Sequence, residues 1–202
     1  MEEGNKIGNV SSITHDNQLG IKASSTPFAS CFYFQDYYDE KEVKKFIKNV
    51  ETLIRRSREY NAYIELLRTN HTQLNHDNIL HNITTSDADL EFHHYPFTLY
   101  EIVEICMNQH ILAGTNFTTF SIAKEVMDLH YANIIGLVPL SKTMHELAHD
   151  NAIFISTDQV FGNYKKFMKD YNNAISAEKK VKIQDIEAKT KANNPSDFGG
   201  LL

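Results

Sequence analysis

Two stretches decide how this sequence can fold: LEFHH at Leu90–His94 and VPLSKTMHELAH at Val138–His149. In the first, apolar Leu90 and Phe92 alternate with Glu91, which is the period-two pattern of a strand. In the second, an apolar run ends at a serine that suits a helix N-cap, and a short helix follows. The sequence therefore predicts a strand that ends in a histidine pair, and a later strand that leads into a helix.

The predicted short helix carries two histidines, His145 and His149. Positions four apart lie on one face of a helix, so both imidazoles can reach the same ion. Histidine is the commonest metal ligand among the side chains, and its pKa also suits general-base catalysis. Three imidazole ligands with an open fourth position are typical of a catalytic metal site and not of a closed structural one.

Together the two stretches resemble the HNH nucleases, which have a ββα-metal fold. The His-His and His-x-x-x-His spacing is similar to that of the colicin-type nuclease toxins, and phage-encoded members look similar over about Arg55–Ser176. The resemblance implies that His93, His145 and His149 hold one divalent ion, with zinc, magnesium, manganese and nickel not distinguished. It also implies that His94 is the general base that activates a water molecule.

The resemblance extends to residues around the site. The family often has an asparagine near the start of the second strand, and this sequence has Gly136 there, so Asn133 or Asn151 would have to orient the base. Lys142, in the first turn of the helix, is a candidate phosphate contact. The long segment between the two stretches, residues 97–134, would be an inserted helical region.

The function predicted from this resemblance is an endonuclease that hydrolyses DNA phosphodiester bonds. The formal net charge of −6 is unusual for such an enzyme, because Lys and Arg contacts to phosphates supply most non-specific affinity for DNA. Arg55, Arg56 and Arg58 form a local basic cluster that could contact DNA or simply be a solvated face. The alternative function is a weakly active or inactive HNH-fold scaffold protein that docks in a larger, possibly phage, assembly.

A second enzymatic interpretation comes from HELAH at residues 145–149, which satisfies the H-E-x-x-H pattern of zinc peptidases. Glu146 would then be the general base, and a distant residue such as Glu178 would have to supply the third ligand. The predicted helix is short, because Pro139 precedes the pattern and Asp150 follows it directly. A short helix between strands favours the ββα interpretation over the peptidase.

The 202 residues and the apolar fraction of 42% predict an α+β protein, a ββα-metal core with a small hairpin embedded in a mostly helical domain. We expect a flexible arm over residues 1–38 and a helical domain over 39–176, with the HNH core at about 79–156. Residues 177–202 would be a charged helix-prone segment and a tail. The arm or the tail Asp197–Leu202 could bind a protein partner.

The chain has no run of about eighteen apolar residues and no signal-peptide pattern, so we expect no membrane span. The predicted location is the cytoplasm, which means the bacterial host if the chain is phage-encoded. Helices are expected over residues 39–70 with Asp39 as N-cap and a break at Arg55–Arg58, and over 97–112, 120–130, 157–176 and 177–192. Residues 80–84 and 89–93 are expected to pair as a hairpin, and Ile134–Val138 to form the second strand.

Overall fold

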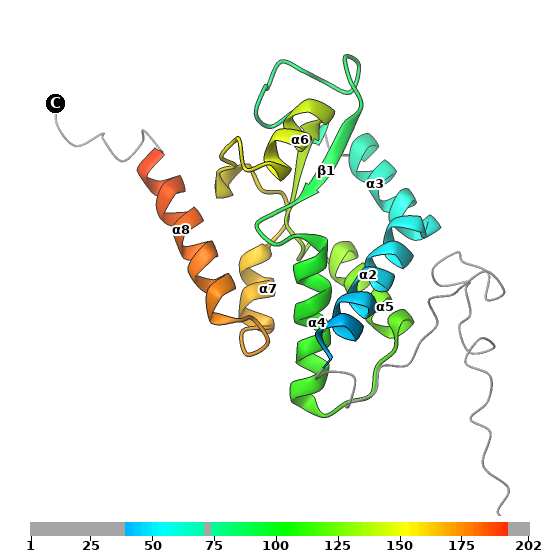
Figure 1. The fold of residues 1–202 in the computed structure, drawn as a ribbon. Helices are drawn as coiled ribbons and strands as arrows, with labels where there is room; N and C mark the ends of the chain where they lie inside the picture. The colour runs from blue at the N-terminus through cyan, green and yellow to red at the C-terminus, as the bar shows by residue number, and fades with distance from the viewer. Residues whose placement is uncertain (1–38, 71–73, 194–202) are drawn as a thin grey trace, which may run out of the picture. The chain divides into compact units, whose positions relative to one another are not determined.

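A computed structural model describes residues 39–70 and 74–193 of the chain. The predicted arm over residues 1–38 and the tail Asp197–Leu202 lie outside these residues. Contacts divide the described chain into two compact units (Figure 1). Residues 39–64 and 99–131 belong to the first unit, and residues 65–70, 74–98 and 132–193 to the second.

The first unit is helical and contains α2 (Glu40–Arg56), α4 (Leu99–Ala113), α5 (Thr119–Tyr131) and the start of α3 (Arg58–Asn70). The carboxylate of Asp39 accepts a hydrogen bond from the backbone N–H of Lys41, which confirms the predicted N-cap. The predicted break is also confirmed, because buried Ser57 separates α2 from α3. Its hydroxyl donates to the carbonyl of Ile54 and accepts from the N–H of Tyr60.

One histidine lies inside this helical core. His130 on α5 is fully buried, its Nδ1 lies 2.7 Å from the carbonyl oxygen of Val126, and Tyr60 and Tyr63 contact its ring edge-on. Burial lowers the pKa of His130 to about 4, although the hydrogen bond to Val126 acts in the opposite direction. His130 is therefore a neutral core residue, as its apolar neighbours in the sequence indicate.

The first prediction follows from this shift. Because unfolded His130 binds a proton near pH 6.5 and folded His130 only near pH 4, the unfolded state binds more protons between these values. The free energy of unfolding should therefore fall as the pH is lowered from 6.5 toward 4, by on the order of 3 kcal/mol from this residue.

Urea denaturation at pH 7 and pH 4.5 with EDTA present measures this loss. In His130→Phe the loss between the two pH values should be clearly smaller than in the wild type. The exposed His81→Asn variant, as a control, should keep the wild-type difference. Equal pH dependence in His130→Phe and the wild type would contradict the assignment.

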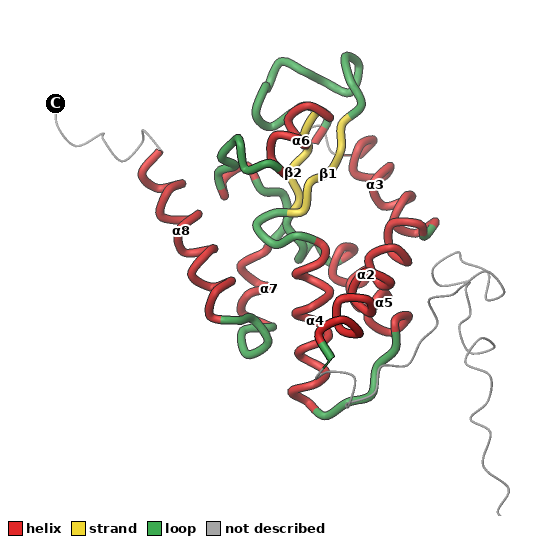
Figure 2. The backbone as a smooth tube through the Cα atoms, in the orientation of Figure 1, coloured by secondary structure: helices red, strands yellow, loops and turns green. Residues whose placement is uncertain are grey.

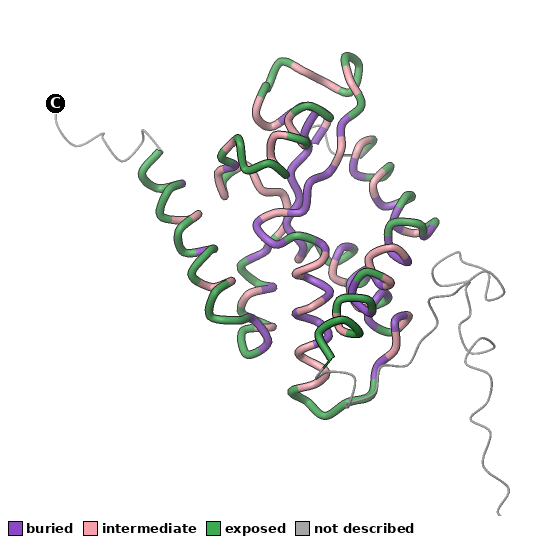
Figure 3. The backbone as a smooth tube through the Cα atoms, viewed as in Figure 1, coloured by how far each residue is buried: buried purple, intermediate pink, exposed green. Residues whose placement is uncertain are grey.

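The second unit contains the sheet, in which β1 (Leu90–His94) pairs antiparallel with β2 (Leu137–Ser141), and α6 (Lys142–His149) directly follows β2 (Figure 2). Further along the chain lie η4 (Thr157–Gln159), α7 (Tyr164–Asp170) and α8 (Ala177–Asn193). Both strands are almost entirely buried (Figure 3). The coarse α+β class is confirmed, the second strand begins three residues later than predicted, and an HNH core is not confirmed.

The predicted hairpin between residues 80–84 and 89–93 is wrong, because β1 pairs with β2 and, among the described residues, with no other strand. The cause is Asp77, a buried residue that the sequence did not single out. One oxygen of its carboxylate accepts the backbone N–H groups of Ile79 and Leu80, at 2.7 and 2.8 Å. These donors are satisfied by a side chain, so the segment forms a loop and not a strand.

The fold requires a glycine at position 136, for a reason unrelated to the asparagine of the HNH pattern. A Cβ atom there would lie 2.0 Å from the carbonyl oxygen of Tyr95, so only glycine allows this close approach. The same approach lets the carbonyl of Gly136 accept the N–H of Tyr95 at 3.0 Å. This contact fixes the chain directly after β1 to the chain directly before β2.

The helix predicted over residues 157–176 is interrupted. Residues Val160–Asn163 separate η4 from α7, and Phe161 forms an isolated bridge with Leu137 of β2. Gly162 has a φ of 97°, a left-handed conformation that a continuous helix does not allow. Within the described part of the chain, no helix is long and apolar enough to cross a bilayer.

Candidate metal centre

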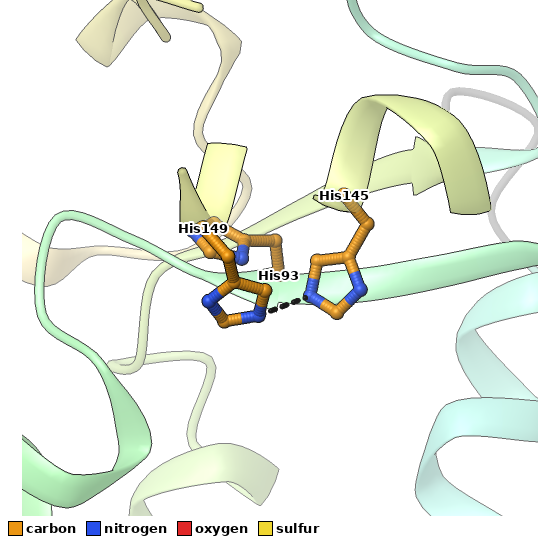
Figure 4. A group of neighbouring side chains, drawn as sticks. All are labelled: His93, His145 and His149. Atoms are coloured by element: carbon orange, nitrogen blue, oxygen red, sulfur yellow. Dashed lines mark hydrogen bonds between the residues drawn. The ribbon is translucent and has the colours of Figure 1, made fainter. Parts of the chain in front are cut away.

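Three histidines from two elements of the second unit meet at one point: His93 from β1, and His145 and His149 from α6 (Figure 4). Each offers a ring nitrogen, and these three atoms all lie within 4.8 Å of one another. The pairing of β1 with β2, and the direct succession of β2 and α6, bring the strand and the helix together. The sequence predicted this group of three.

The spacing of the nitrogens fits a shared ion. Nε2 of His145 lies 3.1 Å from Nε2 of His149, joined by the dashed line in Figure 4. Two nitrogens bound at 2.0–2.1 Å to one tetrahedral zinc ion lie about 3.3 Å apart. The ring centroids of His93 lie 5.1 and 5.0 Å from those of His145 and His149. Small side-chain movements would therefore bring all three imidazoles onto one ion.

Glu91 orients one of these ligands. Nδ1–H of His145 donates a hydrogen bond to the Glu91 carboxylate, which leaves Nε2 with its lone pair toward the other histidines. A ligating histidine almost always donates its second nitrogen to such an acceptor. Glu91 was not among the predicted site residues. The strand pattern nevertheless indicates it, since Glu91 and His93 are two residues apart on a strand and therefore share one face.

Asp77 fixes the start of the helix that carries two ligands. Its second carboxylate oxygen accepts the backbone N–H of Ser141 at 2.7 Å. Burial alone would raise the pKa of Asp77, but its hydrogen bonds to Ser141, Leu80 and Ile79 outweigh burial and hold the pKa below its usual value. Ser141 is the predicted N-cap of α6, yet its own side chain makes no capping bond. Asp77 therefore replaces the missing cap as the anchor of this junction.

His94 does not belong to the group of three. It follows His93 on β1, and successive strand residues point to opposite faces of a sheet. His94 is buried, with only 5% of its surface exposed. Strand geometry therefore separates the histidine pair: His93 faces α6 and His94 does not.

The other predicted site residues are scattered. Lys142 is exposed at the first position of α6, and Arg55, Arg56 and Arg58 belong to the first unit, where all three are exposed. Asn133 and Asn151 each have a φ of 53° and occupy turns. Asn133 accepts the backbone N–H of Asn163 through its carbonyl at 2.8 Å. None of these residues is among the three that could hold an ion.

The two carboxylates required by the peptidase interpretation are also absent from the group. Glu146 is exposed on α6, and Glu178 lies at the start of α8. The third residue beside His145 and His149 is His93. The arrangement thus uses the first histidine of the pair, which the peptidase pattern left without a role.

Comparison with known proteins gives one finding. The model of a family described as bacteriophage G278-like virion protein matches residues 4–200. No curated protein and no solved structure matches the chain.

This finding corrects the predictions made from the HNH resemblance. The matching family is one of virion proteins and not of endonucleases, so both the assignment to the HNH family and the prediction of an endonuclease are wrong. His94 loses its assigned role as a general base, and DNA loses support as a partner. The nuclease activity was inferred from a succession of two strands and a helix with three histidines. Such a fold-level resemblance does not imply a reaction.

Proposed function

Because the chain belongs to the bacteriophage G278-like virion protein family, we propose that it is a structural component of a phage particle whose second unit binds one divalent metal ion. The observation that carries the metal proposal is the convergence of His93, His145 and His149. This role agrees with the alternative function given above, a scaffold protein in a phage assembly, but it does not include an HNH fold.

A structural role for the ion is supported by the helix that would hold it. α6 has eight residues and no fully buried side chain, and its half-buried Met144 and Ala148 pack against the core. A helix this short is marginal on its own, so a further link to the sheet can stabilise it. An ion bound by His93, His145 and His149 would cross-link α6 to β1. Metal binding to a site that exists only in the folded state stabilises that state.

The ligand set favours a transition metal. Neutral imidazole nitrogens suit zinc, copper, iron and nickel, whereas magnesium prefers oxygen ligands and keeps its water molecules. Among the divalent ions left open by the sequence, zinc and nickel therefore fit best.

A virion protein works among other proteins of the particle, so we propose protein partners in place of DNA. The net charge of −6 agrees with this choice, since it disfavours non-specific binding to phosphates. A position in the particle replaces the cytoplasmic location that the sequence suggested.

Two measurements test this function. Mass spectrometry of purified particles should detect the chain at a constant copy number that survives nuclease treatment and high salt. Metal analysis of the purified recombinant protein should give one zinc per chain. A chain that is present in lysates but absent from purified particles would refute the virion role.

A prediction for Glu91 tests the geometry of the site. Glu91→Gln should lower zinc affinity by about 10- to 100-fold, because loss of a carboxylate that orients a histidine ligand typically has this effect. Competition with a chromophoric chelator measures it. Glu146→Gln is the matched control, since it changes an exposed carboxylate next to His145 that is outside the group. Equal losses of zinc affinity in both variants would show that the negative charge near the site matters, and not the orientation of His145 by Glu91.

A further inference from the structure

A cleft in the second unit begins at the candidate metal centre. Its volume is about 630 Å³, and His93 is part of its lining. One wall is formed by Ala148 of α6 and by residues 151–155, and the other by α8, which contributes Lys182, Asp185 and Lys189 among others. A molecule in the cleft can therefore contact His93, one of the three residues that would hold the ion.

The wall formed by α8 is held in place. Ile183 and Thr190 of this helix are buried, and the hydroxyl of Thr190 accepts the N–H of Thr157 at 3.0 Å. The hydroxyl of Tyr164 on α7 donates to Glu187 at 3.0 Å. The cleft is thus bounded on this side by a helix that is fixed to the same unit.

The charges around the cleft favour an anionic ligand. Three neutral imidazoles leave the two positive charges of a divalent ion uncompensated, and three protein ligands leave one coordination position open. Lys182 and Lys189 add two positive charges to the lining against one negative charge from Asp185. An oxygen anion is the ligand that satisfies both the ion and the lysines.

The apolar residues and backbone groups that line the cleft favour a peptide as the ligand. Ile153, Phe154 and Ile186 give the cleft an apolar part, and Phe154 is 39% exposed. Within residues 39–70 and 74–193, the backbone N–H groups of Ile153 and Phe154 have no acceptor. Unpaired backbone donors beside apolar side chains are the features by which proteins bind extended peptide segments.

We propose that this cleft binds an acidic, partly apolar segment of a neighbouring virion protein, and that an Asp or Glu carboxylate of the segment occupies the open position on the metal ion. This rests on the metal site of the proposed function. The ion then serves two purposes: it links α6 to β1, and it fixes a partner chain in the particle. Nucleic acid is disfavoured as the occupant by the apolar lining.

The test uses the full chain loaded with cobalt(II), whose visible spectrum reports the ligands of the ion. The probes are the blocked tripeptides acetyl-Leu-Asp-Phe-amide and acetyl-Leu-Asn-Phe-amide, together with acetate and inorganic phosphate. The Asp peptide should change the cobalt spectrum and bind at least about tenfold more tightly than the Asn peptide, because only a carboxylate supplies an anionic ligand. Acetate should cause the same spectral change at much higher concentration.

Matched variants test the walls of the cleft. Lys189→Glu should weaken binding of the Asp peptide by about tenfold or more, whereas Lys191→Glu, on the same helix but outside the lining, should not. Phe154→Ser should weaken binding of the peptide and leave binding of acetate unchanged.

The outcomes separate the two proposals. If the protein gives no cobalt spectrum at all, the metal site itself is refuted. If the spectrum forms but no probe alters it, the site stands and the peptide proposal fails. If phosphate binds as tightly as the Asp peptide and Phe154→Ser has no effect on either, the occupant is a phosphate compound and the peptide proposal is overturned.

Discussion

Replacing His149 by alanine is expected to lower the zinc affinity of the protein by more than about 100-fold, because losing even a residue that only orients a ligand typically costs 10- to 100-fold. His149 is exposed, so its loss leaves no cavity in the core. The variant should therefore fold normally without metal and differ from the wild type only when zinc is added.

The weaker site should also reduce the free energy by which zinc stabilises the folded protein. With free zinc at 1,000 times its dissociation constant, binding stabilises the wild type by about 4.1 kcal/mol. A 100-fold weaker site at the same zinc concentration gives about 1.4 kcal/mol. Thermal unfolding with zinc and with EDTA measures both values, and the exposed His81→Ala variant is the control. An undiminished zinc effect in His149→Ala would show that the ion binds elsewhere.

The second large effect is expected at Asp77. Asp77→Ala removes the acceptor of three backbone N–H groups, those of Ile79, Leu80 and Ser141. The N–H of Ser141 is buried, whereas those of Ile79 and Leu80 are only partly buried. A buried donor left unsatisfied costs about 1–3 kcal/mol, and water can reach the other two donors, so the variant should lose about 2–5 kcal/mol of stability. Urea denaturation measures the loss.

Two further variants sharpen this test. Asp77→Asn keeps one acceptor oxygen and should lose less stability than Asp77→Ala. Asp87→Ala removes an exposed carboxylate of the same loop that, among the described residues, bonds to Thr84 alone, so it should cost about 1 kcal/mol or less. If Asp77→Ala and Asp87→Ala are equally stable, the anchoring role of Asp77 is wrong.

Most helices of this protein could be predicted from its sequence because their signals are local, although the helix predicted over residues 157–176 is divided into η4 and α7. In α2, Phe46, Ile47 and Val50 recur at helical spacing and are all buried, and Asp39 caps the helix as expected. α6 was predicted from Ser141 and from the two histidines four residues apart. Such patterns depend on neighbouring residues and require no knowledge of distant contacts.

What the sequence did not reveal depends on contacts between distant residues. The pairing of β1 with β2 joins positions separated by the whole of α4 and α5. Asp77 holds the nearer segment as a loop through the N–H groups of Ile79 and Leu80, and it also bonds to Ser141, 64 residues away. The strand pattern places Glu91 on the face of His93, but its bond to His145 joins residues 54 positions apart and is seen only in the structure. The three-histidine group was predicted from a resemblance that proved wrong, so the convergence is right although the reaction inferred from it is not. The predicted domain boundaries at residues 38, 79, 156 and 176 stay predictions.

The most direct test of the account is X-ray absorption at the zinc edge of the zinc-loaded protein, with His93→Ala and His149→Ala measured beside the wild type. We predict one zinc per chain with three imidazole nitrogens at about 2.0–2.1 Å and one further oxygen or nitrogen ligand. Each variant should lose one imidazole from the spectrum. A wild-type spectrum with fewer than three imidazoles, or one that either variant leaves unchanged, would contradict the proposed metal centre.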